Sequence, residues 1–245
     1  MEINIINQIA INAGKAIMEI YSKDSSEQGI EKKADNSPLT LADKAANDLI
    51  VKGLKDNFPH IPIISEEEKN VAYENRRDWG SFWLVDPLDG TKEFIKRNGE
   101  FTVNIALVEN GIPTLGVIYA PVLNTLYFGD LKNGAFKTSD KLTQKITVKH
   151  AKDSFVAVGS RSHQSSLDQE VLAQFDVKEM VSMGSSLKFC LVAEGTADIY
   201  IRTQPTMEWD TAAGHAIVLA AGGRVNGISY NKPDLLNSGF ECFGF

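Results

Sequence analysis

The chain has 245 residues, 43% of them hydrophobic and 23% charged, which is enough for one large or two smaller globular domains. Its net charge of −7 argues against nucleic acid or a polybasic membrane contact as partner, although a bound metal would still admit a small anionic substrate. We expect no signal peptide, because the N-terminus has Glu2 and no basic n-region. We expect no integral membrane segment, since no apolar run reaches ~18 residues. Cys190 and Cys242 form no C-x-x-C motif, and we expect reduced thiols in a cytoplasmic protein.

The first 60 residues predict two helices. Apolar residues recur every four positions in the first of them, which predicts an amphipathic helix on a core: Ile5, Ile9, Ala13, Ile17 and Tyr21. Thr40 and Asp43 fit a capping box that opens a second helix, which carries Leu41, Ala45, Leu49 and Phe58. The first interpretation of Asp43 is therefore structural, as an acid that accepts hydrogen bonds at a helix start.

Two short apolar runs each lead into carboxylates. Residues 61–64 predict a strand before Ser65-Glu66-Glu67-Glu68, and residues 83–85 predict a buried strand before Asp86-Pro87-Leu88-Asp89-Gly90. If these strands are parallel neighbours, Glu66 or Glu67 lies beside Asp86. Successive acids are more often a solvated face, and Asp89 has the alternative role of capping a helix that starts near Thr91.

Asp86 and Asp89 are close enough in sequence to repel each other. At about 4 Å and an effective dielectric near 20, two such charges cost roughly 4 kcal/mol. A cation between them, or a retained proton, would relieve the repulsion. The turn contains no arginine, and carboxylates together with a backbone carbonyl, such as that of Leu88, suit Mg²⁺. These residues alone leave a metal site and a structural turn as equal alternatives.

The remaining chain divides into two patterns. Short β-rich runs between residues 101 and 137, separated by turn residues such as Asn110-Gly111, predict an antiparallel meander. We place a domain boundary near His150, giving a 1–150 half and a 151–245 half. The second half predicts strands at 155–158 and 198–202 and helices at 167–175, from 184 to 193 and from 209 to 222.

Four residues of the second half are candidates for binding. Gly184 and Ser185 at a predicted helix start form a potential anion pocket, with Lys188 on the same helical face. Asp210 stands at the start of the Ala-rich helix, where its structural alternative is an N-cap.

Common catalytic motifs are missing from the sequence. It contains no G-x-S-x-G, Walker A, G-x-G-x-x-G or H-E-x-x-H motif, and its four histidines lack zinc-site spacing. What remains is a set of oxygen ligands at element ends: Glu66, Asp86, Asp89 and Asp210. Paired hard metal ions held by such groups serve phosphoryl transfer.

These separated motifs, in this order, resemble the signature of the lithium-sensitive, magnesium-dependent phosphatases of the inositol monophosphatase superfamily. The resemblance is carried by Asp43, by Ser65-Glu66-Glu67, by Asp86-Pro87-Leu88-Asp89-Gly90-Thr91 and by Trp209-Asp210-Thr211-Ala212-Ala213-Gly214. Residues 83–104, with Lys92-Glu93-Phe94, resemble more narrowly the CysQ-type branch, the bacterial 3'(2'),5'-bisphosphate nucleotidases. The implied fold class is α/β (α+β), with layers in the order αβαβα and the site between two αβ halves.

The resemblance also implies residue roles. Two or three Mg²⁺ ions would be held by Glu66, Asp86, Leu88 (through its carbonyl), Asp89 and Asp210. Thr91 and Glu66 would orient the attacking water, with Asp43 supporting Thr91. The implied substrate-binding set is Glu66, Leu88, Asp89, Gly90, Thr91, His163, Ser185, Lys188, Arg202 and Asp210.

Three functional hypotheses follow. The first is a Mg²⁺-dependent phosphatase that converts adenosine 3',5'-bisphosphate (PAP) to AMP and phosphate in sulfur metabolism, with phosphoadenylyl sulfate (PAPS) as a second substrate. The alternative is an inositol monophosphatase or another sugar-phosphate phosphatase, and the third is a non-enzymatic sensor, against which the complete acid set argues. We expect a monomer or homodimer in the cytoplasm, and peripheral contact with the cytoplasmic face of the inner membrane stays open.

Overall fold

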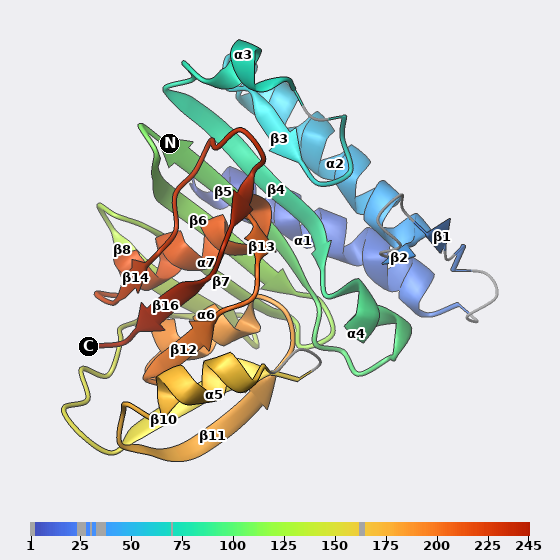
Figure 1. Cartoon of the computed structure of the whole chain (residues 1–245). Helices are drawn as coiled ribbons and strands as arrows, with labels where there is room; N and C mark the ends of the chain where they lie inside the picture. Colours follow the sequence, from blue (N-terminus) through green and yellow to red (C-terminus); the bar gives the residue numbers. More distant parts are fainter. Residues whose placement is uncertain (1–2, 24–27, 30, 33–37, 70, 162–164) are drawn as a thin grey trace.

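A pair of helices covers one face of the larger of the two main β-sheets (Figure 1). The computed structural model describes residues 3–23, 28–29, 31–32, 38–69, 71–161 and 165–245. Helix α1 (Ile3–Tyr21) buries four residues of the predicted stripe against the sheet: Ile9, Ala13, Ile17 and Tyr21. The fifth, Ile5, is only partly buried. None of the described helices combines the length and apolarity needed to cross a bilayer.

Helix α2 (Leu41–Asn57) begins at the predicted capping box but buries a different face from the predicted one. Leu41 and Leu49 are 44% and 42% exposed, and the buried stripe starts one residue later, at Ala42, Ala46, Ile50 and Leu54. The small residues allow close packing on α1, since a Cβ at Gly53 would lie 2.8 Å from Ile9 Cγ1.

The larger sheet has seven strands in the order β3-β4-β5-β6-β7-β8-β9. They are β3 (Ile63–Ser65), β4 (Ser81–Asp89), β5 (Thr102–Glu109), β6 (Ile112–Ala120), β7 (Thr125–Asp130), β8 (Gly134–Ser139) and β9 (Leu142–Ile146). β3 and β4 are parallel, which is the condition under which Glu66 or Glu67 would lie beside Asp86. β5 to β8 form the predicted antiparallel meander, and β4 and β9 extend it at its two ends. The edge strand β9 was not predicted, because its residues are mostly exposed and show no apolar alternation.

The smaller sheet has five strands in the order β11-β10-β12-β16-β14. They are β10 (Phe155–Ser160), β11 (Val177–Met183), β12 (Ile199–Arg202), β14 (Arg224–Asn226) and β16 (Phe240–Phe243). Only β10 and β12 were predicted. The other elements of this half are α5 (Ser166–Leu172), α6 (Leu187–Ala193), β13 (Thr206–Met207), α7 (Glu208–Ala220) and β15 (Leu236–Asn237).

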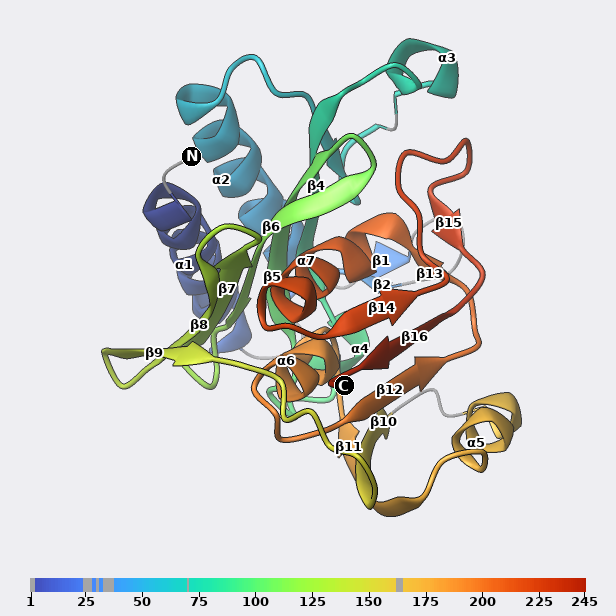
Figure 2. The same cartoon turned by 90° about the vertical axis from the view of Figure 1, so that its left-hand side faces the viewer.

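The elements stack in five layers (Figure 2). One apolar cluster lies between α1, α2 and the larger sheet, a second joins both sheets through α6 and α7, and a third lies under α5. This is the predicted αβαβα order. The proposed boundary near His150 lies between β9 and β10, but α7 packs on the first half's sheet, so the division into halves stays a prediction. The short elements β1 (Glu31–Lys32), β2 (Pro38–Leu39), α3 (Tyr73–Arg76) and α4 (Thr91–Ile95) complete the fold.

Candidate active site

Strand β4 carries the buried Asp86 and ends in a turn that breaks the ladder with β5. Asp86 pairs with Asn104 and Asp89 with Thr102, so the register shifts over Pro87, which has no N–H to donate. The Asp86 Oδ1 accepts a 3.0 Å hydrogen bond from Leu88 N. On the other side, Glu66 N donates to Val85 O at 3.1 Å and continues the β3–β4 pairing. This parallel pairing is what brings Glu66 beside Asp86.

Asp210 comes to the same place from the first turn of α7. It is the third residue of the helix, and the N-cap is Met207, so the N-cap interpretation of Asp210 is wrong. Its Oδ2 accepts hydrogen bonds from Thr206 Oγ1 at 2.6 Å and from Met207 N at 2.9 Å, which fixes the carboxylate. One carboxylate oxygen from each of Glu66, Asp86 and Asp210 lies within 4.8 Å of the other two.

Asp89 lines the same pocket with a separate set of partners. Its Oδ2 lies 2.6 Å from Ser186 Oγ and 3.4 Å from Asn104 Nδ2, and neither partner was a candidate from the sequence. The alternative role of Asp89 as a helix cap is wrong, because α4 is capped by Gly90 at φ +92°. A Cβ at Gly90 would also lie 3.2 Å from Glu100 O, so both the positive φ and the close backbone approach favour glycine here.

The negative charges of the acids at this site repel one another when no cation is bound. Burial raises the pKa of Asp86 well above its ordinary value, and the negative charges of Glu66, Asp89 and Asp210 raise it further. Burial, followed by Asp89 and Glu66, raises the pKa of Asp210 to about 7. Hard carboxylate oxygens gathered from three elements are the donor set that Mg²⁺ prefers, and the cation would replace the protons.

Asp43 contacts both the helix cap and the site. Its Oδ2 accepts from Thr40 N at 2.7 Å and from Thr40 Oγ1 at 2.6 Å, which is the predicted capping box. Its Oδ1 lies 3.4 Å from Thr91 Oγ1, at the start of α4. Burial raises the pKa of Asp43 to about 6, although the Thr40 hydrogen bonds oppose the rise. The structural and functional interpretations of Asp43 therefore use different oxygen atoms and coexist.

The acids open into a pocket of about 330 Å³. It is lined by Glu66, Asp86, Leu88, Asp89, Gly90, Thr91, Lys92, Glu93, Ser160, Gly184, Ser185, Arg202 and Asp210. Ser185 has a left-handed backbone (φ +48°), which is strained for a residue with a side chain. Arg202 extends along the pocket and donates to the carbonyls of Gln204 and Pro205.

Of the predicted nucleotide contacts, one lies away from the pocket and another falls outside the described residues. Lys188 is buried, does not line the pocket, and donates through Nζ to Ser185 O at 2.6 Å and Met183 O at 3.3 Å. Its burial lowers its pKa to about 8. His163 lies outside the described residues, so its predicted contact stays a prediction.

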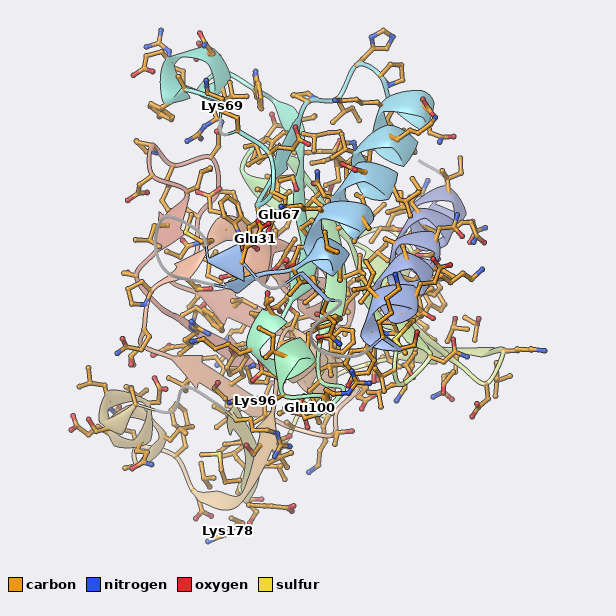
Figure 3. All side chains as sticks on the ribbon, turned by 90° about the vertical axis from the view of Figure 1, so that its right-hand side faces the viewer. Glu31, Glu67, Lys69, Lys96, Glu100 and Lys178 are labelled. Carbon is orange, nitrogen blue, oxygen red and sulfur yellow. The ribbon has the colours of Figure 1, made fainter. Side chains whose placement is uncertain are left out.

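Glu100 is outside the pocket lining but holds Gly184, which lines the pocket, and sequence reasoning missed this role. It lies beyond the end of α4 (Figure 3), and its carboxylate binds the Arg161 guanidinium at 2.7 and 2.6 Å. It also accepts from Gly184 N at 2.8 Å. Glu100 thus joins the turn before α6 to the loop after α4, two segments that meet only in the tertiary structure.

The chain belongs to the inositol monophosphatase family, whose model matches residues 2–243. It is 49% identical to the 3'(2'),5'-bisphosphate nucleotidase CysQ of Salmonella typhimurium, with 96% of each chain covered. It is 48% identical to the protein of the same name from Escherichia coli K12, again with 96% of each covered. The crystal structure of CysQ from Bacteroides thetaiotaomicron superposes with a TM-score of 0.86 and 45% sequence identity. The match covers 100% of this chain and 98% of that chain. The predicted family and fold class are confirmed.

Proposed function

We propose that this protein is a Mg²⁺-dependent 3'(2'),5'-bisphosphate nucleotidase that hydrolyses the 3'-phosphate of PAP to give AMP and phosphate. The observation that carries the proposal is the meeting of the Glu66, Asp86 and Asp210 oxygens within 4.8 Å, beside a pocket of nucleotide size. The CysQ relatives at 48–49% identity support this substrate class.

The acids would hold two or three Mg²⁺ ions, with the Leu88 carbonyl and Asp89 completing the donor set. When bound, these ions would lower the pKa of a water molecule and neutralise charge on the phosphoryl group. Asp89 is held by the Ser186 hydroxyl, and Asp210 by Thr206, so both carboxylates are oriented before any ligand arrives.

Thr91 is proposed to orient the attacking water. If its hydroxyl donates to Asp43 Oδ1, 3.4 Å away, an oxygen lone pair remains to accept a hydrogen bond from the water. Glu66, which lines the same pocket, would accept the second water proton. The Gly90 and Thr91 N–H groups are proposed to bind the scissile phosphate, while Ser185 and Arg202 would contact the nucleotide.

A substrate panel tests this proposal. We expect kcat/KM with Mg²⁺ to be highest for PAP, lower for PAPS and lowest for inositol 1-phosphate, with inhibition by lithium. Asp86→Asn should lower kcat for PAP at least ~100-fold, because it removes a charged ligand. Asp153→Asn, at an exposed position outside the pocket, is the matched control and should leave kcat unchanged.

Two results would overturn the proposal. Preference for inositol 1-phosphate over PAP would favour the alternative of a sugar-phosphate phosphatase. Absence of turnover on every substrate would favour the sensor hypothesis. The monomeric or homodimeric state and the cytoplasmic location remain predictions. Gel filtration with light scattering and cell fractionation would test them.

A further inference from the structure

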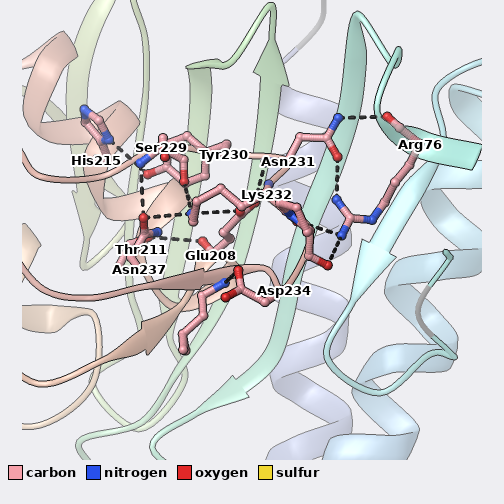
Figure 4. Close-up of polar contacts among 12 residues, drawn as sticks. Arg76, Glu208, Thr211, His215, Ser229, Tyr230, Asn231, Lys232, Asp234 and Asn237 are labelled. Atoms are coloured by element: carbon pink, nitrogen blue, oxygen red, sulfur yellow. Dashed lines mark hydrogen bonds and ion pairs between the residues drawn. The ribbon is translucent and has the colours of Figure 1, made fainter. Parts of the chain in front are cut away.

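We infer that Glu208 is a positioning residue for Asp210, and that Arg76 supports it through residues 231–233. The inference rests on the proposed function, because it treats Asp210 as a metal ligand. The residues form a buried polar network between the β3–β4 connection and the start of α7 (Figure 4). We call Arg76, Glu208, Asn231 and Lys232 the clamp.

Glu208 is the first residue of α7 and is completely buried. Its carboxylate accepts three hydrogen bonds, from Asn231 N at 2.7 Å, Lys232 N at 2.9 Å and Lys232 Nζ at 2.9 Å. Its own N–H donates to Leu235 O at 2.9 Å. Burying a carboxylate is costly unless it is paired in this way. These four hydrogen bonds all connect Glu208 to one loop, residues 231–235.

The strand that follows this loop, β15, holds the chain just before Asp210. β13 pairs with β15, with Thr206 opposite Asn237 and Met207 opposite Leu236. Thr206 and Met207 are the two residues that donate to Asp210 Oδ2. The Asp210 carboxylate is therefore fixed by a segment whose own position is set by the loop and by Glu208.

Arg76 fixes that loop from the other half of the chain. It is 2% exposed and donates only to neutral oxygens in its described hydrogen bonds. Three of these lie in the loop: Asn231 Oδ1 at 2.6 Å, Lys232 O at 2.7 Å and Pro233 O at 2.9 Å. Asn231 returns a hydrogen bond to Arg76 O at 2.8 Å.

The position of Arg76 explains why the clamp matters for the proposed metal site. Arg76 lies between β3 and β4, the strands that carry Glu66 and Asp86, whereas Glu208 lies two residues before Asp210. The clamp thus connects the elements that supply the three converging carboxylates. Because Mg²⁺ demands near-ideal octahedral geometry, a small shift of the start of α7 would weaken metal binding.

The test compares two clamp variants with a matched control. In Glu208→Gln, an amide N–H group would face a backbone N–H donor, so the loop must shift. Arg76→Lys keeps the charge but loses the guanidinium fork. The control is Glu194→Gln, since Glu194 accepts from Lys137 Nζ at 2.7 Å and from Tyr127 OH at 3.1 Å, away from the pocket. The two lysines are equally exposed, at 24% for Lys137 and 25% for Lys232.

Two readouts are needed on the full chain. Mn²⁺ binding is followed by the electron paramagnetic resonance of the free ion, and the Mg²⁺ concentration for half-maximal PAP hydrolysis is measured separately from kcat. Removing a supporting partner of a metal ligand typically costs 10–100-fold in affinity. We expect both clamp variants to weaken Mn²⁺ binding, and to raise the half-saturating Mg²⁺ concentration, about tenfold. Glu194→Gln should change neither, although its metal-free unfolding midpoint falls.

The outcomes separate the inference from the proposed function. If both clamp variants bind Mn²⁺ as tightly as wild type while their unfolding midpoints fall, the clamp is structural only and the inference is rejected. If Glu208→Gln does not fold, Arg76→Lys alone decides in the same way. If wild type binds no Mn²⁺, or Asp210→Asn binds it normally, the proposed metal site fails, and the inference fails with it.

Discussion

Two carboxylates of the site are fixed through one of their oxygen atoms. Asp43 uses Oδ2 for the cap of α2 and Oδ1 for Thr91, while Asp210 uses Oδ2 for Thr206 and Met207. A side chain fixed through one oxygen has lost its rotamer freedom before it binds anything through the other. This is the preorganisation that catalysis by positioning requires.

Thr91 offers the sharpest test at the residue scale. Thr91→Val keeps the shape but removes the hydroxyl that contacts Asp43, so under the proposed mechanism the attacking water would lose its orientation. We expect kcat for PAP to fall by about 10²–10³, the order associated with losing proton-transfer assistance. Thr91→Ser keeps the hydroxyl and should stay within about tenfold of wild type by the phosphate-release assay. Equal activity of the valine and serine variants would contradict the assigned role.

His215 should make stability depend on pH. Its Nδ1 lies 2.9 Å from Tyr230 OH, and burial lowers its pKa from 6.5 to about 4. Between these pH values the unfolded chain binds a proton that the native state does not, so the free energy of unfolding falls as the pH falls. The contribution reaches about 3 kcal/mol near pH 4.

The measurement for His215 is a difference between proteins. We compare urea unfolding of wild type and His215→Gln from pH 7 to pH 4, so that all other titrating groups cancel. The gap between the two free energies should shift steadily in favour of the variant as the pH falls. The exposed His60 provides the control variant His60→Gln, which should run parallel to wild type. Parallel curves for all three proteins would disprove the prediction.

At the scale of elements, helix α7 and strand β6 make an unusually close contact. A Cβ at Gly116 of β6 would lie 2.3 Å from the backbone oxygen of Ala213, and one at Gly214 would lie 2.4 Å from the Phe189 ring. Glycine at these positions lets α7 approach the larger sheet on one side and α6 on the other. Since α7 carries Asp210, this approach also places the site.

Gly116→Ala should therefore be destabilising, by about 1–3 kcal/mol, because the obstacle is backbone and cannot rotate away. Gly80→Ala is the matched control: its nearest neighbour would be Asn110 Oδ1 at 3.8 Å, and its φ is not positive. Urea unfolding monitored by tryptophan fluorescence would measure both variants. A Gly116→Ala protein as stable as Gly80→Ala would show that α7 can shift without cost.

The sequence predicted those elements whose signals are local. Asn110-Gly111 predicted a hairpin because both residues can take positive φ, and they do so at +51° and +78°. Glu66 directly after β3 and Asp86 in β4 suggested a shared site on the condition that the two strands are parallel neighbours, which they are. Strands β11 and β14 were not predicted because their residues are exposed or only half-buried, and β16 was not predicted because it has only four residues.

The residues of the site also fall into those that local sequence signals predict and those that they do not. The converging acids stand in short motifs, so their types and spacing could be read from the sequence. Ser186, Asn104 and Glu100 orient these acids or the pocket turns, yet only tertiary contacts reveal it. Arg76 meets Asn231 across 155 residues, a distance over which no sequence periodicity acts.

At the scale of the whole molecule, the acids lie beside the layer in which α6 and α7 join the two sheets. Without a bound cation, the protein holds the buried Asp86 beside the half-buried Asp210 and Glu66. The pKa values of Asp86 and Asp210 are raised, and this charge cluster opposes folding at neutral pH. A cation that binds the native state alone would convert that cost into stabilisation.

Mg²⁺ should therefore raise the unfolding midpoint. At a free concentration of 100 times Kd, a single site contributes about 2.7 kcal/mol, and for a chain of this size each kcal/mol shifts the midpoint by about 2–4 °C. We expect a rise of about 5–10 °C by scanning calorimetry, reversed by chelation. NaCl at matched ionic strength separates specific binding from screening, and Asp210→Asn removes a proposed ligand. If NaCl reproduces the full shift, or if Asp210→Asn responds to Mg²⁺ as wild type does, the carboxylates are a charge cluster that salt screens and not a binding site.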